Sequence, residues 1–311
     1  MPIKKTITYT LTIVIVIGLL LFVLINKDRF LKYRSEEKNI DQEIIYPEAE
    51  QSHKVVFEDR ELFLKAVGDY PFRRDSMNPG IKGGIIPHHI LPSFIIADFF
   101  SCLSAEEIET IVLVGPNHYE RGNFSVITSG YKWETPFGVL KPDNEIITDL
   151  ESKKIIEKDE TVIPLDHSMT SILPFIQYYL PEVKVVPLIL KSDFSEEEVD
   201  ELAGELRKYI QSRKIILLAS VDFSHYLTNF EAKEKNTESL EAIKKRSYDE
   251  IFAFGNEHMD SPASVALVLK VMDAIDSKQM TVLHDTNSGE MIGDNFAQIT
   301  SYLSLSFSTN K

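Results

Sequence analysis

The chain has 311 residues, and 48 Asp or Glu against 33 Lys or Arg give it a formal net charge of −15. Hydrophobic residues make up 43% of the sequence, which excludes a disordered protein and suffices for a sizeable core. A single cysteine, Cys102, excludes a disulfide framework and a zinc site built from several thiolates. The negative charge repels phosphate backbones, so nucleic acid is not an expected partner.

The amino-terminal segment predicts a membrane anchor. Residues 1–6 form a short tail, and residues 7–25 contain no charged side chain. As a helix this run would span roughly 28 Å, close to the thickness of the hydrocarbon core of a bilayer. Charged residues follow it in place of the small-residue site of a cleaved signal peptide, which favours a retained single-pass anchor. Basic residues flank the run on both sides, so the predicted localisation is a membrane, with the side of the main domain undecided.

A charged tether and one α/β domain are expected after the anchor. Residues 26–75 are predicted to be the tether, with a short helix near 56–67, and residues 76–308 the domain. The predicted strands cover residues 83–87, 110–115, 124–130, 183–190, 214–221, 280–286 and 299–307, and the predicted helices cover 92–103, 144–152, 168–180, 196–211, 231–247 and 262–276. This alternation predicts a three-layer α/β/α sandwich with a central, mostly parallel or mixed sheet.

Histidines recur where the predicted strands end or the helices begin. Five separate segments supply them, at His88, His118, His167, His225 and His258. Because parallel strands bring their carboxyl ends to one edge of a sheet, these imidazoles can converge on a metal ion, with Asp166 and Asp222 as hydrogen-bond acceptors behind them. The alternative is that each histidine has a separate structural role.

Several of these segments resemble the Memo family, whose bacterial members are often named AmmeMemoRadiSam system protein B. The matching segments are PHH (87–89), VGPNH (114–118), TPFG (135–138), DHS (166–168) and SVDFSHY (220–226). The resemblance runs in order from about residue 80 to 307. That family is similar in fold to the class III extradiol dioxygenases, which are non-haem iron enzymes with a mixed sheet between helical layers.

The resemblance implies a role for each matching residue. His88 and His118 match the two metal-coordinating histidines. His225 matches the acid/base histidine that faces the metal in the dioxygenases, and Asp222 is the acidic residue of that motif. The remaining pocket or outer-sphere candidates are His167, Asp166 and Tyr119.

The third metal ligand departs from the family pattern. Animal members supply a cysteine four residues before a proline, whereas here the residue four before Pro262 is His258. A histidine could replace the thiolate and complete a three-histidine site. Asp260 is the rival, which would give two histidines and one carboxylate, and a site without a third protein ligand is the remaining alternative.

These residues lead to a functional hypothesis with alternatives. The first is metal-dependent redox chemistry of the dioxygenase type on an unknown small substrate, with a divalent metal that is expected to be Fe(II), or else copper or zinc. The second is a non-catalytic metal-binding or scaffold protein on the same fold. A metallohydrolase using Asp222 or Asp260 as a base is a weaker third. A functional link to Amme-type and radical SAM proteins is implied by the resemblance only.

Overall fold

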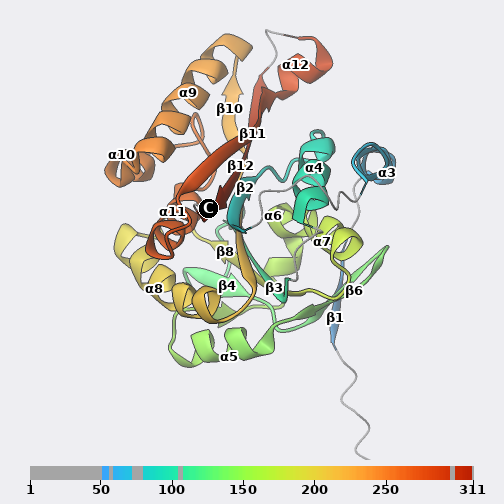
Figure 1. Ribbon diagram of the computed structural model, residues 1–311, viewed down its shortest axis with the longest axis vertical. Helices are drawn as coiled ribbons and strands as arrows, with labels where there is room; N and C mark the ends of the chain where they lie inside the picture. Colours follow the sequence, from blue (N-terminus) through green and yellow to red (C-terminus); the bar gives the residue numbers. More distant parts are fainter. Residues whose placement is uncertain (1–50, 56–58, 72–79, 104–107, 295–297, 310–311) are drawn as a thin grey trace, which may run out of the picture. The chain divides into compact units, whose positions relative to one another are not determined.

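A twelve-stranded mixed sheet forms the centre of the domain (Figure 1). The computed structural model describes residues 51–55, 59–71, 80–103, 108–294 and 298–309, and the chain from Gln51 onward belongs to one compact unit. The strands are β1 (Ser52–Lys54), β2 (Ile81–Ile86), β3 (Thr110–Pro116), β4 (Val126–Thr128), β5 (Lys132–Thr135), β6 (Gly138–Pro142), β7 (Glu157–Lys158), β8 (Lys184–Leu190), β9 (Ile215–Ser220), β10 (Phe223–Leu227), β11 (Gln279–Asn287) and β12 (Ile299–Ser308).

The middle of the sheet is parallel and its two sides are mixed. Its order is β1-β5-β6-β8-β3-β9-β2-β12-β10, with β11 beside β12 and with β4 pairing both β7 and β8. Neighbouring strands from β6 to β2 are parallel, whereas β12 is antiparallel to β2, β10 and β11. The carboxyl ends of β3, β9 and β2 therefore lie side by side at one edge.

Helices cover both faces of the sheet and close two hydrophobic cores. One core takes side chains from α3 (Arg60–Asp69), α4 (Ser93–Leu103), α6 (His167–Thr170) and α7 (Leu173–Tyr179). The other takes them from α5 (Asn144–Ser152), α8 (Glu196–Ser212), α9 (Asn229–Lys245), α10 (Tyr248–Ala253) and α11 (Pro262–Ala274). The 3₁₀ turn η1 (Ile163–Leu165) and the short α12 (Ser288–Ile292) complete the fold. Strand β3 serves both cores, since Val112 and Val114 face one and Ile111 and Leu113 face the other.

The predicted mixed α/β architecture is confirmed, with differences of detail. Each predicted strand and helix has a counterpart, but the helix predicted at 168–180 divides into α6 and α7. Strand β10 was not predicted, because residues 223–227 carry polar side chains and pair with β12 only through an irregular register. The hairpin of β5 and β6 was also missed.

Part of the predicted tether belongs to the domain. Strand β1 pairs in parallel with β5, and α3 buries Phe63 completely in the core. Helix α3 starts later than the predicted 56–67, because Asp59 caps it by accepting from the backbone N–H groups of Glu61 and Leu62. The folded domain thus begins near residue 51, and the rest of the predicted tether lies outside the described residues.

The predicted membrane localisation is corrected. No helix in the described part of the chain is long and apolar enough to cross a bilayer. The apolar helix α11 has only 13 residues, and the 17-residue helices α8 and α9 are rich in charged side chains. The segment 7–25, on which the anchor prediction rested, lies outside the described residues, and a membrane anchor is not retained as a property of this protein.

Candidate metal centre

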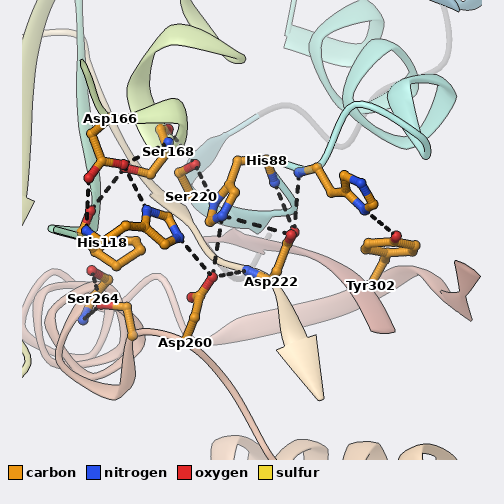
Figure 2. A network of polar contacts seen from close by, with 12 residues as sticks. His88, His118, Asp166, Ser168, Ser220, Asp222, Asp260, Ser264 and Tyr302 are labelled. Atoms are coloured by element: carbon orange, nitrogen blue, oxygen red, sulfur yellow. Dashed lines mark hydrogen bonds and ion pairs between the residues drawn. The ribbon is translucent and has the colours of Figure 1, made fainter. Parts of the chain in front are cut away.

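The carboxyl ends of three neighbouring parallel strands supply the centre of the site. His88 follows β2, His118 follows β3 and Asp222 follows β9. Figure 2 shows these side chains together with Asp260, which comes from the loop before α11, directed toward one region. The predicted convergence of strand-end residues is therefore present in the fold.

His88 is buried against two carboxylates. Its side chain is 1% exposed, and its Nε2 lies 3.3 Å from Asp260 Oδ2 and 3.7 Å from Asp222 Oδ2. On the other side of the ring, the Ser220 hydroxyl lies 3.2 Å from Nδ1. Burial, only partly offset by the charge of Asp222, lowers the pKa of His88 to about 4. The imidazole is thus neutral at physiological pH, which is the form that binds a metal.

His118 is oriented by Asp166. The Nδ1 of the ring lies 2.8 Å from Asp166 Oδ1, and the His118 backbone N–H donates to Oδ2 at 2.8 Å. Burial opposes ionisation of Asp166, but the hydrogen bonds from His118 and Ser168 hold the pKa of this carboxyl below its usual range. An ionised Asp166 accepts a hydrogen bond from the Nδ1–H group of His118. The proton therefore stays on Nδ1, and the lone pair of Nε2 faces the site. This is the acceptor role that the sequence predicted for Asp166.

His167 extends the imidazole cluster. It is the first residue of α6, and Asp166 caps that helix by accepting from the Ser168 backbone N–H. The His167 ring stacks on His118 with 3.9 Å between centroids and lies 5.1 Å from the ring of His88. The structure therefore places His167, a pocket candidate of the DHS segment, beside the rings of His88 and His118.

Asp260 faces both of the leading histidines. Its Oδ2 lies 3.3 Å from His88 Nε2 and 3.9 Å from His118 Nε2. Two backbone contacts fix it to Asp222: the Asp222 N–H donates to Asp260 Oδ2 at 3.2 Å, and the Asp260 N–H donates to the Asp222 carbonyl at 3.1 Å. Its other oxygen, Oδ1, is buried and has no hydrogen-bond partner among the described residues.

Among the described residues, neither carboxylate of the site has a Lys or Arg partner. The titratable nitrogen atoms that approach Asp222 and Asp260 there belong to histidines. Burial and the nearby charge of Asp222 raise the pKa of Asp260 well above its ordinary value. A buried pair of acids facing neutral imidazoles is electrostatically unfavourable without a cation, and a divalent metal would supply that charge.

The donor set fits a divalent metal ion. Two overlapping groups have ligand atoms within 4.8 Å of one another, namely His88 with His118 and His167, and His88 with Asp222 and Asp260. Neutral imidazoles and carboxylates suit Fe(II), zinc or copper, and two histidines with one carboxylate are the usual ligands of non-haem iron. The residues present therefore fit a metal centre, and their identity does not select the metal.

A cavity of about 350 Å³ opens beside this cluster. Its lining includes His118, Asp260 and His225, so a molecule in the cavity would contact the metal-facing side chains. His225 lies on β10, and its Nδ1 is buried without a hydrogen-bond partner in the described part of the chain. Burial lowers the pKa of His225, which keeps the ring available to accept a proton.

Two predicted site residues lie elsewhere. His258 is not brought to His88 and His118; its Nε2 lies 2.8 Å from Glu238 Oε2, and its ring stacks on Phe254 at 3.9 Å. The structure therefore does not bring His258 to the other two predicted ligands, whereas Asp260, the alternative third ligand, lies beside them. Tyr119 is 51% exposed, lies beside the Arg121 guanidinium, and does not line the cavity.

Sequence reasoning missed the hydroxyl groups behind the imidazoles and the cavity wall. Ser220 donates to the Ser168 carbonyl at 2.6 Å, which leaves its oxygen free to accept from His88 Nδ1. Its position as the polar last residue of an otherwise apolar strand was the available signal. Phe252 and Phe254, which line the cavity, had no signal, because Phe252 lies in helix α10 and Phe254 caps its end, and this helix was not predicted.

Comparison with known proteins identifies the family of the chain. The family model described as Memo-like protein matches residues 64–306, and the chain therefore belongs to the Memo family. A MEMO1 family protein of Nitrosopumilus maritimus is 28% identical over 227 residues, which are 70% of this chain and 81% of the relative. One from Aquifex aeolicus is 27% identical over 234 residues, covering 73% and 85%. A crystal structure of an uncharacterized Escherichia coli K12 protein superimposes with a TM-score of 0.48 and 14% identity, covering 71% of this chain and 99% of that one.

Proposed function

We propose that the protein is a metal-dependent oxidoreductase of the Memo family with a single divalent metal held by His88, His118 and Asp260. The observation that carries this proposal is the position of Asp260 Oδ2, at 3.3 and 3.9 Å from the Nε2 atoms of the two histidines. Three protein ligands on one side of a metal leave coordination positions open for small molecules, which is the arrangement of non-haem iron oxygenases. Fe(II) is the favoured metal, with copper or zinc as alternatives.

The surrounding residues have separate tasks in this proposal. Asp166 and Ser220 orient the rings of His118 and His88, and Asp222 holds the His88 segment by accepting from its backbone N–H at 3.0 Å. When bound, the metal would supply Lewis acidity and, if it is iron or copper, electron transfer. His225, which lines the cavity and whose Nδ1 has no hydrogen-bond partner among the described residues, would take or give the proton of the substrate.

The ligand assignment is tested by metal titration of the full-length protein. Asp260→Asn should weaken Fe(II) and Zn(II) binding by at least about 100-fold, because it removes a charged ligand. His258→Ala, which removes the ligand suggested by the sequence spacing, should leave metal affinity unchanged. Weaker metal binding in His258→Ala together with unchanged binding in Asp260→Asn would contradict the proposed ligands and indicate His258 as the third ligand.

The reaction class is tested by oxygen uptake of the Fe(II)-loaded protein with a panel of small organic substrates. Uptake should require iron and fall about 10²- to 10⁴-fold in His225→Ala, which keeps the proposed ligands. A fully loaded protein that consumes no oxygen with any substrate would favour the non-catalytic metal-binding alternative. Hydrolysis of ester or amide substrates without oxygen would favour the metallohydrolase.

A further inference from the structure

The cavity beside the metal centre is lined by both polar and apolar side chains, and Lys191 is the one Lys or Arg among the described residues of its lining. Its volume of about 350 Å³ lies at the small end of the range for ligand pockets. One of its lining residues, Asp260, has an exposed side-chain fraction of only 8% and belongs to the metal cluster. A ligand in this cavity would therefore contact the site of the proposed reaction at one end.

Lys191 is the basic residue of the cavity lining, and the fold holds it in place. It directly follows β8, at the same edge of the sheet as His118, and its backbone N–H donates to the Ser125 carbonyl at 3.0 Å. Its ammonium donates to the Gly122 carbonyl at 2.8 Å, which uses one of three N–H groups. No carboxylate oxygen of the described residues pairs with it, so its charge is available to a ligand.

Besides Asp260, the cavity lining contains one further acidic residue among those described, Glu120, and its carboxylate is already engaged. Glu120 Oε1 accepts from the Ser192 backbone N–H at 3.0 Å, and the Glu120 residue is exposed to solvent. Solvent screens an exposed carboxylate more strongly than it screens a partly buried ammonium. The charge of the half-buried Lys191 is therefore screened less by solvent than the charge of Glu120, and it would act more strongly on a ligand inside the cavity.

Two aromatic side chains of the lining supply apolar surface, and one of them is supported from behind. These are Phe252 and Phe254, and the Phe254 ring lies against the His258 ring at 3.9 Å with an interplanar angle of 11°. His258 is in turn held by Glu238 at 2.8 Å. Such a supported aromatic wall favours an apolar molecular body over a fully polar one.

One lining residue of the same cavity, Tyr226, has a strained backbone conformation. Tyr226, which also lines it, has φ = 62° and is 68% exposed, immediately after His225. A bulky residue in the left-handed region costs free energy, and an exposed aromatic ring gains none from burial in the free protein. A ligand that covers Tyr226 would compensate for this strain.

We propose that this cavity binds a small ligand made of an apolar body and one anionic group, a carboxylate or a phosphate, with the anion on Lys191. The apolar body lies along Phe252 and Phe254, and the far end of the ligand reaches His118, Asp260 and His225. This inference rests on the proposed function, since it names the substrate class of the same site.

The test is isothermal titration calorimetry of the full-length, zinc-loaded protein with three probes. These are 3-phenylpropanoate, phenyl phosphate and the neutral 3-phenylpropan-1-ol. At least one anion should bind about tenfold more tightly than the alcohol, and the better anion identifies the natural group. Lys191→Met should remove this difference and leave alcohol binding unchanged, whereas Phe252→Ala should weaken all three probes.

The matched control is Lys184→Met, at the opposite end of β8, where the side chain is exposed. Equal effects of Lys191→Met and Lys184→Met, equal affinity for the alcohol and the anions, or no binding of any probe at millimolar concentration would overturn the proposal. Metal content is measured on the same samples. A wild-type protein that takes up no metal would refute the proposed function. In that case, the affinities of the wild type and Lys191→Met for the three probes, measured without zinc, would still show whether Lys191 binds the anion.

Discussion

Strand β3 connects two buried polar clusters whose carboxylates have different partners. At its first residue, the Thr110 hydroxyl donates to Asp143 Oδ2 at 2.6 Å, and the Arg213 guanidinium donates to the same oxygen at 2.7 Å. Beyond its last residue, Asp260 faces the imidazoles of His88 and His118, the backbone N–H of Asp222 and the nearby Asp222 carboxylate. Both carboxylates are almost fully buried, with exposed side-chain fractions of 0% and 8%.

The difference separates a structural cluster from a functional one. Each carboxylate has one buried oxygen without a hydrogen-bond partner, so that feature alone does not distinguish the two ends. The presence of a permanently charged cation distinguishes them. Asp143 pairs with Arg213, whereas Asp260 has no Lys or Arg partner in the described part of the chain. Buried charge without a partner costs stability, and such a cost persists at sites where a bound ion offsets it.

The largest effect is expected at the structural end. Arg213→Ala would leave Asp143 buried without its cation, and should lower the free energy of unfolding by about 3 kcal/mol. Urea denaturation of the metal-free protein measures this change. Arg207→Ala, at an exposed position of helix α8, whose C-cap is Arg213, is the matched control and should change stability by less than about 0.5 kcal/mol. Equal effects of the two variants would remove the distinction between the two clusters.

Acid titration sharpens the same comparison. Burial opposes ionisation of Asp143, but the hydrogen bonds from Thr110 and Arg213 hold its pKa below the ordinary value. A lowered folded-state pKa contributes stability that is present above the unfolded value of about 3.9 and is lost as the pH falls through the folded value. Wild-type stability should therefore decline more steeply below about pH 4 than that of Arg213→Ala. Parallel curves would show that the pair does not carry this dependence.

An intermediate effect is expected at Asp166. Asp166→Asn keeps the size of the side chain but removes the charge that holds the proton on His118 Nδ1, so metal affinity should fall about 10- to 100-fold. Competition titration with a chromophoric chelator measures this loss. Asp193→Asn, at an exposed position near the end of β8, is the control. Unchanged affinity in Asp166→Asn would mean that His118 needs no orienting acceptor.

A smaller effect of opposite sign is expected at Asp260 when no metal is bound. Asp260→Asn removes one of two buried acids that have no Lys or Arg partner among the described residues, and should raise the free energy of unfolding of the metal-free protein by about 1 kcal/mol. Urea denaturation in the presence of a chelator tests this, with Asp143→Asn as the contrasting variant that should lose stability. Destabilisation of both variants would indicate that Asp260 is structural as well.

The smallest effect on the metal is expected at His258. His258→Ala removes the stacking contact with Phe254 and the ion pair with Glu238, whose side chain is 48% exposed. Stability should fall by about 1 kcal/mol, while the metal content should equal that of the wild type. Elemental analysis of the purified variant measures the metal content. A loss of metal would place His258 in the ligand set after all.

Local patterns were sufficient to predict most of the fold and half of the site. The apolar runs that became β2, β3, β8 and β9 end at polar residues, and parallel pairing then brings His88, His118 and Asp222 together. The choice between His258 and Asp260 could not be made from spacing. An isolated antiparallel bridge between Phe223 and Met259 sets the register there, so that Asp260 lies beside Asp222. This pairing joins segments far apart in the sequence, so the number of residues between His258 and Pro262 could not predict it.

Metal content tests the central claim most directly. Elemental mass spectrometry is carried out on the full-length protein purified without oxygen, on His88→Ala/His118→Ala, and on His284→Ala. The control removes an imidazole that pairs with Asp98 at 2.9 Å, outside the cluster. The account predicts about one metal ion per chain in the wild type and in His284→Ala and almost none in the double variant. Equal metal content in all three proteins would contradict a metal centre at the carboxyl ends of β2 and β3.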